Sequence, residues 1–252
     1  MREGWKTARL ADVCTFKPPK KEARQRLNPE DAVSFVPMNN LGVRKKELEL
    51  CEERLLEKVA GSYTYFAEGD VLLAKITPCF ENGKLGIASG LTNGVGFGSS
   101  EFIVMRPGDE LDAEYLFYLL SQDSVRDAGA RVMSGAVGHK RVPKELVEGL
   151  QLTLPAVTEQ KRIVAILDEL EIEAQRLEAI YQQKLTALAE LKQSLLQKAF
   201  AGELAADRAG HEIEGAAIAA RISSRVRDPR SKAPPQKQRS RQPKVRGQGD
   251  PR

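Results

Sequence analysis

Residues 156–201 contain neither glycine nor proline, and this run constrains the fold more than any other feature of the chain. Glycine and proline are the residues that most disfavour a helix interior, so the run predicts one uninterrupted helix. Pro155 stands at a permitted helix start, Thr158 and Glu159 give the first turn capping and acidic character, and Gly202 stands where a helix end favours glycine. About 45 residues at a rise of about 1.5 Å each would form a helix roughly 65–70 Å long.

Apolar residues recur every seven positions along this helix, in two interleaved series. Nine of the ten positions can bury apolar surface, and Lys184 is the exception. Such a repeat predicts a coiled-coil seam against another helix, in which a polar residue can set the register at a cost in stability. The alternative is a helix that folds back on its own domain. The residues expected to pack in the seam are Ile163, Leu167, Leu170, Leu177, Tyr181, Leu188, Leu191 and Leu195, with Ala174 completing the second series.

The preceding residues, 1–154, have the pattern of one mixed α/β domain. Segments of strand length that are apolar or β-branched occur at 33–37, 71–76, 101–105 and 150–154. Arg106-Pro107-Gly108 is expected to end the third strand, and Asp112 to begin a helix. Asn-Gly pairs at 82–83 and 93–94 predict tight turns. The expected fold class is therefore α+β, a globular mixed α/β domain followed by one long coiled-coil-type helix over 155–204.

The last segment, 205–252, is alanine-rich at first and then basic, and its composition predicts disorder. Residues 221–252 hold 11 Lys and Arg against 2 Asp and Glu, although the whole chain has a net charge of only +4. The other 220 residues are therefore net acidic, so the isoelectric point is no argument for nucleic-acid binding by the body of the protein. The tail could add salt-sensitive affinity for phosphate, or it could be a solvated terminus without a role.

Several protein classes are disfavoured by simple features. No apolar run of about 18 residues occurs, so we expect no membrane span, and residues 1–6 lack the apolar segment of a secretory signal. Cys14, Cys51 and Cys79 are scattered and odd in number, which favours a reducing cytoplasm over a disulfide framework.

Catalytic motifs are also missing from the sequence. It has no Gly-x-x-x-x-Gly-Lys-Ser/Thr phosphate loop, no His-Glu-x-x-His zinc motif and no Asn/Asp-Pro-Pro-Tyr/Phe methyltransferase motif. The glycines at 94, 96 and 98 lack the strand-then-helix context of a dinucleotide site. His139 and His211, the two histidines, have no plausible nucleophile nearby in sequence. We therefore expect no catalytic residue and no metal site in this chain.

Polar side chains that can read DNA gather in three predicted loops. Arginine and lysine pair with guanine, and asparagine with adenine, in the major groove, while neighbouring glycines let a backbone approach phosphate. Loop polarity is also the default for any globular protein, so each cluster alone is weak evidence. The first cluster is Asn39, Asn40, Arg44, Lys45 and Lys46, the second is Lys75, Thr77, Asn82 and Lys84, and the third is Ser134, His139, Lys140 and Arg141.

Both ends of the long helix resemble those of the specificity subunits of type I restriction–modification systems. Residues 154–168, LPAVTEQKRIVAILD, look like the Pro-x-x-x-Glu-Gln-x-x-Ile-Val-x-x-Leu-Asp motif that opens the family's helix. Residues 191–204, LKQSLLQKAFAGEL, resemble its closing signature. Trp5 with residues 10–13, and the segment 69–74, resemble more loosely the opening and the central strand of a target-recognition domain.

The resemblance implies a DNA-reading subunit without catalysis. It implies that residues 1–154 form a target-recognition domain, which reads half of a bipartite site in double-stranded DNA. It further implies that the helix spaces the two halves and docks methyltransferase subunits and motor–nuclease restriction subunits. S-adenosylmethionine, ATP and Mg²⁺ would be bound by those partners, and no cofactor by this chain.

Members of the family carry two recognition domains and two such helices, whereas this sequence has one of each. It could therefore be a half-size subunit that forms a homodimer or pairs with a second specificity chain through the helix. It could also be a truncated product or a decoy that occupies partner subunits without reading DNA. A fragment of a fused restriction–methylation enzyme would need catalytic motifs that we do not find.

Overall fold

The computed structural model describes residues 4–136 and 138–201. They divide into two compact units, one that ends at Arg176 and one that begins at Leu177, and each is described here by itself. The predicted long helix is α7 (Val157–Phe200), which contributes residues to both units. Gly202, His211 and the predicted basic tail, 205–252, lie outside the described residues.

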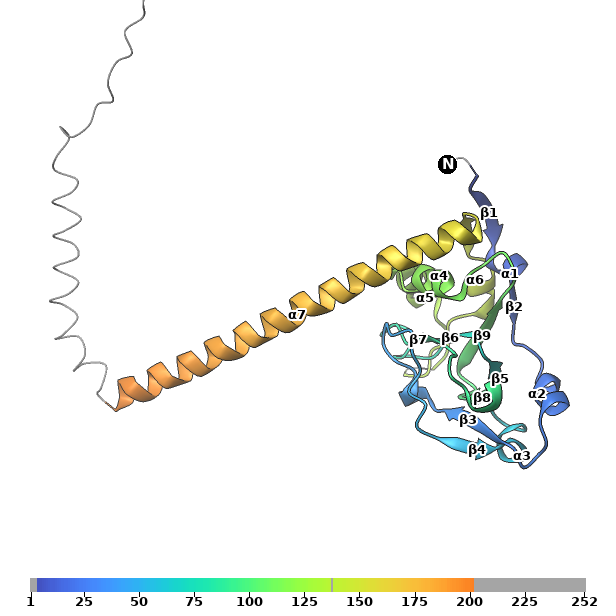
Figure 1. The fold of residues 1–252 in the computed structure, drawn as a ribbon, viewed down its shortest axis with the longest axis horizontal. Coiled ribbons are helices and arrows are strands. Elements are labelled where there is room, and N and C mark those ends of the chain that lie inside the picture. The colour runs from blue at the N-terminus through green and yellow to red at the C-terminus, as the bar shows by residue number, and fades with distance from the viewer. Residues whose placement is uncertain (1–3, 137, 202–252) are drawn as a thin grey trace, which may run out of the picture. The chain divides into compact units, whose positions relative to one another are not determined.

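The first unit is built from short strands and helices (Figure 1). Its strands are β1 (Lys6–Arg9), β2 (Cys14–Phe16), β3 (Ala32–Val36), β4 (Glu53–Leu55), β5 (Thr64–Ala67), β6 (Val71–Ala74), β7 (Leu85–Ile87), β8 (Val95–Gly98), β9 (Phe102–Pro107) and β10 (Gln151–Leu154). Its helices before α7 are α1 (Leu10–Val13), α2 (Lys21–Arg26), α3 (Leu56–Val59), α4 (Ala113–Leu120), α5 (Asp123–Val132) and α6 (Lys144–Glu148), with 3₁₀ turns η1 (Met38–Asn40) and η2 (Thr92–Gly94). This composition confirms the predicted α+β class.

Two four-stranded sheets form the centre of this unit. The first has the order β2-β9-β6-β7, and its neighbouring strands are antiparallel. The second has the order β4-β3-β8-β5, in which β3 and β8 are parallel and the other pairs antiparallel. A separate antiparallel pair joins β1 to β10, so that the beginning of the domain lies beside the strand that leads into α7.

The side chains of β6 show how the layers are stacked. Val71 and Leu73 belong to the apolar cluster that also contains residues of α1, α4, α6 and the start of α7. Leu72 and Ala74 belong to a second cluster, which contains residues from both sheets. Successive residues of a strand point to opposite faces, so a strand covered on both faces is apolar throughout. This explains why residues 71–74 read as a continuous apolar run rather than an alternating one.

Gly96 and Gly98 of β8 leave room for two aromatic rings, that of Phe66 on the neighbouring strand β5 and that of Phe102 on β9 of the other sheet. A Cβ atom added at Gly96 would overlap the ring of Phe66, and one added at Gly98 would lie 2.7 Å from Cε2 of Phe102. Both aromatic residues belong to the cluster that contains residues from both sheets. These glycines therefore serve packing in the core.

The predicted strands are present, with shifted ends. β3 and β10 lie within one residue of the expected segments, whereas β6 ends at Ala74 and leaves Lys75 and Ile76 outside the strand. The third strand, β9, ends within Arg106-Pro107-Gly108 as expected, but it continues two residues past Met105, to Pro107. The strand extends because Arg106 pairs with Thr15 of β2 and its guanidinium donates to the buried carboxylate of Asp70 at 2.6 and 2.9 Å.

Two helix starts agree with the sequence analysis. Asp112 caps α4, and its carboxylate accepts the backbone N–H groups of Glu114 and Tyr115 at 3.0 and 3.1 Å. α7 begins at Val157, two residues after Pro155. None of the helices within residues 4–136 and 138–201 combines the length and the apolar character that crossing a membrane requires.

Candidate nucleic-acid interface

The loop of residues 75–84, between β6 and β7, brings the three predicted polar clusters together. At its start, the backbone N–H of Thr77 donates to the carbonyl of Lys140 at 2.9 Å, and that of Val142 donates to the carbonyl of Lys75 at 2.8 Å. At its end, the N–H of Arg44 donates to the carbonyl of Gly83 at 3.1 Å. The first and third clusters therefore flank the second through backbone contacts.

Internal hydrogen bonds and one buried ring hold this loop. The N–H of Phe80 donates to Ile76 at 3.0 Å, and the N–H of Asn82 donates to Pro78 at 2.9 Å. Phe80 is buried, and a Cβ atom on Gly129 of α5 would overlap its ring. The loop thus has a fixed base, while the Asn82 side chain at its tip is exposed.

The first cluster divides its side chains between internal bonds and solvent. The Asn40 amide donates to the carbonyl of Glu49 at 2.8 Å, and Arg44 forms an exposed ion pair with Asp123 at 3.0 Å. Asn39 and Lys45 are exposed. The amine of Lys84, from the second cluster, donates to the carbonyls of Met38 and Asn39 at 2.8 and 3.4 Å and so joins the second cluster to the first.

In the second cluster, two further side chains bond within the domain. The Lys75 amine donates a hydrogen bond to the carbonyl of Ser100 at 3.0 Å. Thr77 donates its hydroxyl to Glu81 at 2.9 Å. Both bonds are partly or fully solvent-exposed, so these groups stay near the surface.

The third cluster is a small hairpin closed by reciprocal backbone bonds between Ser134 and Arg141, of 3.1 and 2.8 Å. The Arg141 guanidinium donates two hydrogen bonds to the carboxylate of Glu101, at 2.9 and 2.7 Å. These bonds lower the pKa of Glu101. His139 and Lys140 stand at the exposed tip, where the left-handed Gly135 (φ 131°) fits tightly against the carbonyl of His139.

Six predicted residues have side chains without a hydrogen bond or ion pair to the part of the chain that the structure describes. A group without an internal partner can bind an external one at no cost to the fold. These residues are Asn39, Lys45, Asn82, Ser134, His139 and Lys140.

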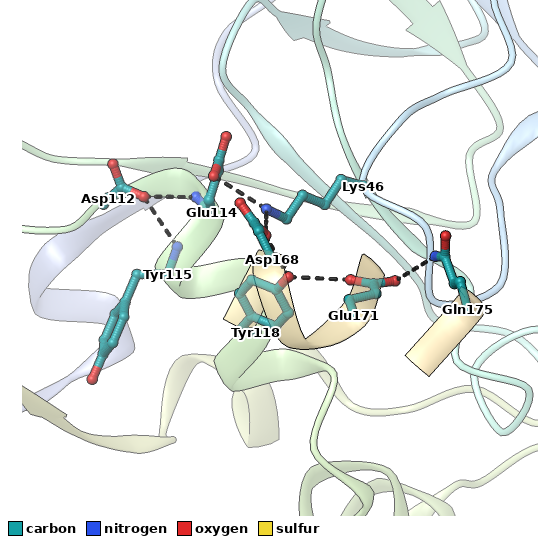
Figure 2. Close-up of polar contacts among 8 residues, drawn as sticks. All are labelled: Lys46, Asp112, Glu114, Tyr115, Tyr118, Asp168, Glu171 and Gln175. Carbon is teal, nitrogen blue, oxygen red and sulfur yellow. Dashed lines mark hydrogen bonds and ion pairs between the residues drawn. The ribbon is translucent and has the colours of Figure 1, made fainter. Parts of the chain in front are cut away.

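Lys46 differs from the other members of its cluster, because its amine contacts α7 (Figure 2). It forms ion pairs with Asp168 of α7 and with Glu114 of α4, the latter at 3.2 Å, and it lies 4.8 Å from the centre of the Tyr118 ring. The Tyr118 hydroxyl donates to Asp168 at 2.5 Å and lies 3.1 Å from a carboxylate oxygen of Glu171. These contacts join the first cluster, α4 and the first part of α7.

The pKa shifts in this network follow from burial and charge. Burial disfavours the charged amine of Lys46, but hydrogen bonds from its amine to Asp168 and Glu114 outweigh burial and raise its pKa. For Asp168, burial opposes ionisation, and the hydrogen bonds from Lys46 and Tyr118 outweigh it and lower the pKa. Burial and the neighbouring carboxylates raise the pKa of Tyr118, which keeps its hydroxyl a donor.

Gln160 makes a second connection between α7 and the domain, and the sequence analysis gave it no role. Its side chain is fully buried. Its amide donates to the carbonyls of Glu110 and Pro155 at 2.8 and 2.9 Å, and its oxygen accepts the N–H of Asp112 at 2.8 Å. The signal in the sequence was the Glu-Gln pair of the helix-opening motif. A glutamine that is buried must have hydrogen-bond partners for its polar atoms, as Gln160 has here.

Comparison of the sequence with known proteins shows the family of this chain. Residues 2–187 match the family model described as the type I restriction modification DNA specificity domain. The chain belongs to this specificity family. It is 38% identical over 187 residues to the type I restriction enzyme EcoEI specificity subunit of Escherichia coli, and 34% identical over 187 residues to the EcoAI specificity subunit of the same species. Each alignment covers 74% of this chain and 30% or 31% of the relative, so the chain matches less than a third of each relative's length.

Solved structures of specificity subunits share the fold. The HsdS subunit from Thermoanaerobacter tengcongensis superposes with a TM-score of 0.56 at 22% identity, covering 75% of this chain and 48% of that one. A chain from a structure described as showing complex assembly and conformational transition of the type I R-M system gives a TM-score of 0.57, also at 22% identity, covering 81% of this chain and 47% of that one. At this identity the likeness establishes the fold of the specificity family.

The predicted seam residues of this specificity chain differ in exposure. In the first unit, Ile163 packs partly buried against the core, Leu167 is half-buried and Leu170 is exposed. In the second unit, the five predicted seam residues, Leu177, Tyr181, Leu188, Leu191 and Leu195, are between 46% and 63% exposed. The residues from Leu177 to Leu195 therefore present a row of apolar side chains without a covering partner among the described residues.

The described parts of the specificity chain hold no group of three or more His, Cys, Asp and Glu side chains placed to bind a metal ion. The three cysteines are free thiols, and burial raises the pKa of Cys14 to about 12.

Proposed function

We propose that this chain reads one half of a bipartite site in double-stranded DNA and holds methyltransferase subunits at that site. The observation that carries the proposal is the meeting of three polar clusters around residues 75–84, inside the segment that matches the DNA specificity domain. The interface would use exposed groups of complementary chemistry. Asn39 and Asn82 can both donate to and accept from adenine, whereas Lys45 and Lys140 can donate to guanine or to phosphate.

Successive segments of the chain have different roles in this proposal. Residues 1–154 read DNA, residues 155–204 space and dock the subunits, and the basic tail, 205–252, adds phosphate affinity. The row of apolar residues on α7 would pack against a second copy or a second specificity chain. A homodimer has two-fold symmetry, so it would read two inverted copies of one half-site. Methyltransferase and motor–nuclease partners would supply S-adenosylmethionine, ATP and Mg²⁺ in the cytoplasm, while this chain adds no catalytic group.

A competing function is that of a decoy, which binds partner subunits through α7 without reading DNA. The observation behind it is the exposed apolar row of α7, which can pack against a partner helix whether or not the domain reads DNA. Both functions use the helix, so only DNA binding separates them.

The test uses the full chain, co-expressed with the methyltransferase subunit of its own system. We expect the two proteins to purify together and to shift duplex DNA. Lys140→Ala should weaken DNA binding by removing an exposed amine from the interface, and it should leave the fold intact because that amine makes no internal bond. Lys58→Ala, at an exposed lysine outside the clusters, should not weaken DNA binding. A loss confined to one base position of about 1–3 kcal/mol would identify a base contact, and a uniform loss a phosphate contact. A complex that forms but shifts no duplex would establish the decoy.

A further inference from the structure

A cleft that shares only Lys75 with the three predicted clusters is lined by lysines from three separate segments of the first unit. Its volume is about 370 Å³, and its walls include Phe102 and Val104 of β9 and Tyr65 of β5, one strand from each sheet. Lys17, Lys20, Lys75 and Lys144 line it as well, and no aspartate or glutamate does. Four cations and no carboxylate in one lining suit an anionic ligand.

The protein itself holds these amines in place. Lys20 donates to the carbonyl of Gly61 at 2.7 Å, and Lys75 donates to that of Ser100 at 3.0 Å. An ammonium group has three N–H donors, so each of these two keeps donors for a ligand. The Lys144 amine lies 5.4 Å from the centre of the Phe16 ring and pairs with Glu148.

Lys17 has a backbone conformation that is unusual for a residue with a side chain. Its φ is 53°, in the left-handed region that glycine adopts without strain. Strained residues of this kind persist where the surrounding structure holds them, and they gather at functional sites. Lys17 is exposed, and its amine makes no ion pair or hydrogen bond with the described residues.

The positive charges around the cleft are only partly compensated. Burial, followed by the charges of Arg24 and Lys17, lowers the pKa of Lys20. The nearby carboxylate of Glu22 already accepts from Arg106 at 2.7 Å. Glu101 lies 4.0 Å from the Lys75 amine, but Arg141 occupies it with two hydrogen bonds. A bound anion would relieve the repulsion between Lys17 and Lys20.

Lys75 connects this cleft with the candidate interface. It lines the cleft and is also the first residue of the loop 75–84, where its carbonyl accepts the N–H of Val142. Lys144, two residues after Val142, lines the cleft too. The cleft is therefore joined to the third cluster through the backbone contacts of Lys75 and through the segment from Val142 to Lys144.

We propose that Lys17, Lys20, Lys75 and Lys144 form a binding site for the phosphodiester backbone of the DNA duplex, beside the bases that the three loops read. This site rests on the proposed DNA-reading function and adds contacts that are independent of sequence. Lysine contacts to phosphate release condensed counterions, so each contributes to the salt dependence of binding without contributing to base choice.

The test measures duplex binding by the full chain as a function of salt, for the wild type and for Lys17→Gln/Lys20→Gln. The basic tail is present in both proteins, so its contribution cancels in the comparison. The slope of log affinity against log salt should shrink by about 0.9 for each lost phosphate contact, and affinity should fall on the order of tenfold for every sequence alike. Lys21→Gln is the matched control, because this exposed neighbour does not line the cleft. Its affinity should stay within about twofold of wild type. Thermal unfolding of both variants checks their folding.

The possible outcomes separate the cleft from the proposed function. An unchanged salt slope in the double variant, while Lys140→Ala still weakens binding, would refute the cleft and leave DNA reading intact. A loss confined to particular bases would also overturn it, since phosphate contacts do not read sequence. Submillimolar binding of inorganic phosphate without DNA would assign the cleft to a small anion instead. A wild-type chain that binds no duplex even at low salt would refute both proposals.

Discussion

Lys46 links the candidate interface to α7 through a single side chain. It follows Arg44 and Lys45 in the first cluster, yet its amine pairs with Asp168 on the helix and Glu114 on α4 (Figure 2). The side chain of Lys46 is 17% exposed and that of Asp168 is 38% exposed, so the pair is partly screened by solvent. We therefore attribute to Lys46 a positioning role, which sets the first cluster relative to the start of the helix.

Replacing this lysine should loosen the docking of α7. Lys46→Met keeps most of the side-chain length but leaves Asp168 and Glu114 without their cation, and we expect the unfolding free energy to fall by about 1–3 kcal/mol. Lys45→Met, an exposed neighbour, should change it by less than about 0.5 kcal/mol. Chemical denaturation of the full chain measures both. A double-mutant cycle with Asp168→Asn would contradict the link if the two losses were additive.

The ion pair between Lys46 and Asp168 predicts that the docking of α7 weakens in acid. The pKa of Asp168 is lowered in the folded chain, so its ionised form stabilises the fold. That contribution is complete above the ordinary value of 3.8 and is lost as the pH falls through the lower folded value. Stability in acid should therefore fall less steeply in Asp168→Asn than in the wild type.

Residue-scale roles were only partly predictable from the sequence. Asp112 was recognisable as a helix cap, because capping depends on neighbours within three residues. Lys46 was predicted only as a DNA-binding residue and Gln160 was given no role, because the partners that join them to α7 and to the domain lie 122 and 48 residues away in the chain. The three loop clusters could be named from composition, but their meeting around residues 75–84 depends on tertiary backbone contacts that no local pattern encodes.

At the scale of elements, α7 was the most predictable, and its apolar face in the second unit has no covering partner among the described residues. Its length could be predicted from the absence of glycine and proline. Its heptad repeat predicted that one face of the helix packs against another helix. In the second unit, the predicted seam residues are exposed, and Ile180 and Leu185 widen the apolar row. The strands were harder to delimit, since β9 continues through Arg106 and Pro107 by pairing with β2.

The apolar row should be required for subunit association. Leu177→Asp/Leu188→Asp is expected to raise the dissociation constant of self-association or of partner binding at least roughly 100-fold, since each buried leucine contributes about 1.5–3 kcal/mol. Thr186→Asp/Gln193→Asp introduces the same two negative charges on the opposite side of the heptad and should leave association intact. Sedimentation and co-purification measure the outcome, and circular dichroism checks that α7 stays helical. Equal behaviour of the two double variants would refute the seam.

At the scale of the whole molecule, the described residues form a mixed α/β domain and one long helix, and the chain matches less than a third of each curated relative's length. Composition and motifs were sufficient for the family and the fold class. They left the partner of α7 open, because a heptad repeat specifies a packing surface but not the chain that covers it. The central claim is that this chain supplies one half of a two-part reader.

Selection from a random duplex library tests this claim most directly. The complex of the full chain with its methyltransferase subunit should enrich two inverted copies of one short sequence, separated by a spacer of fixed length. The inversion follows from two-fold symmetry, and the fixed spacer from rigid helices between the domains. Enrichment of no sequence by a complex that forms and binds DNA would contradict the account.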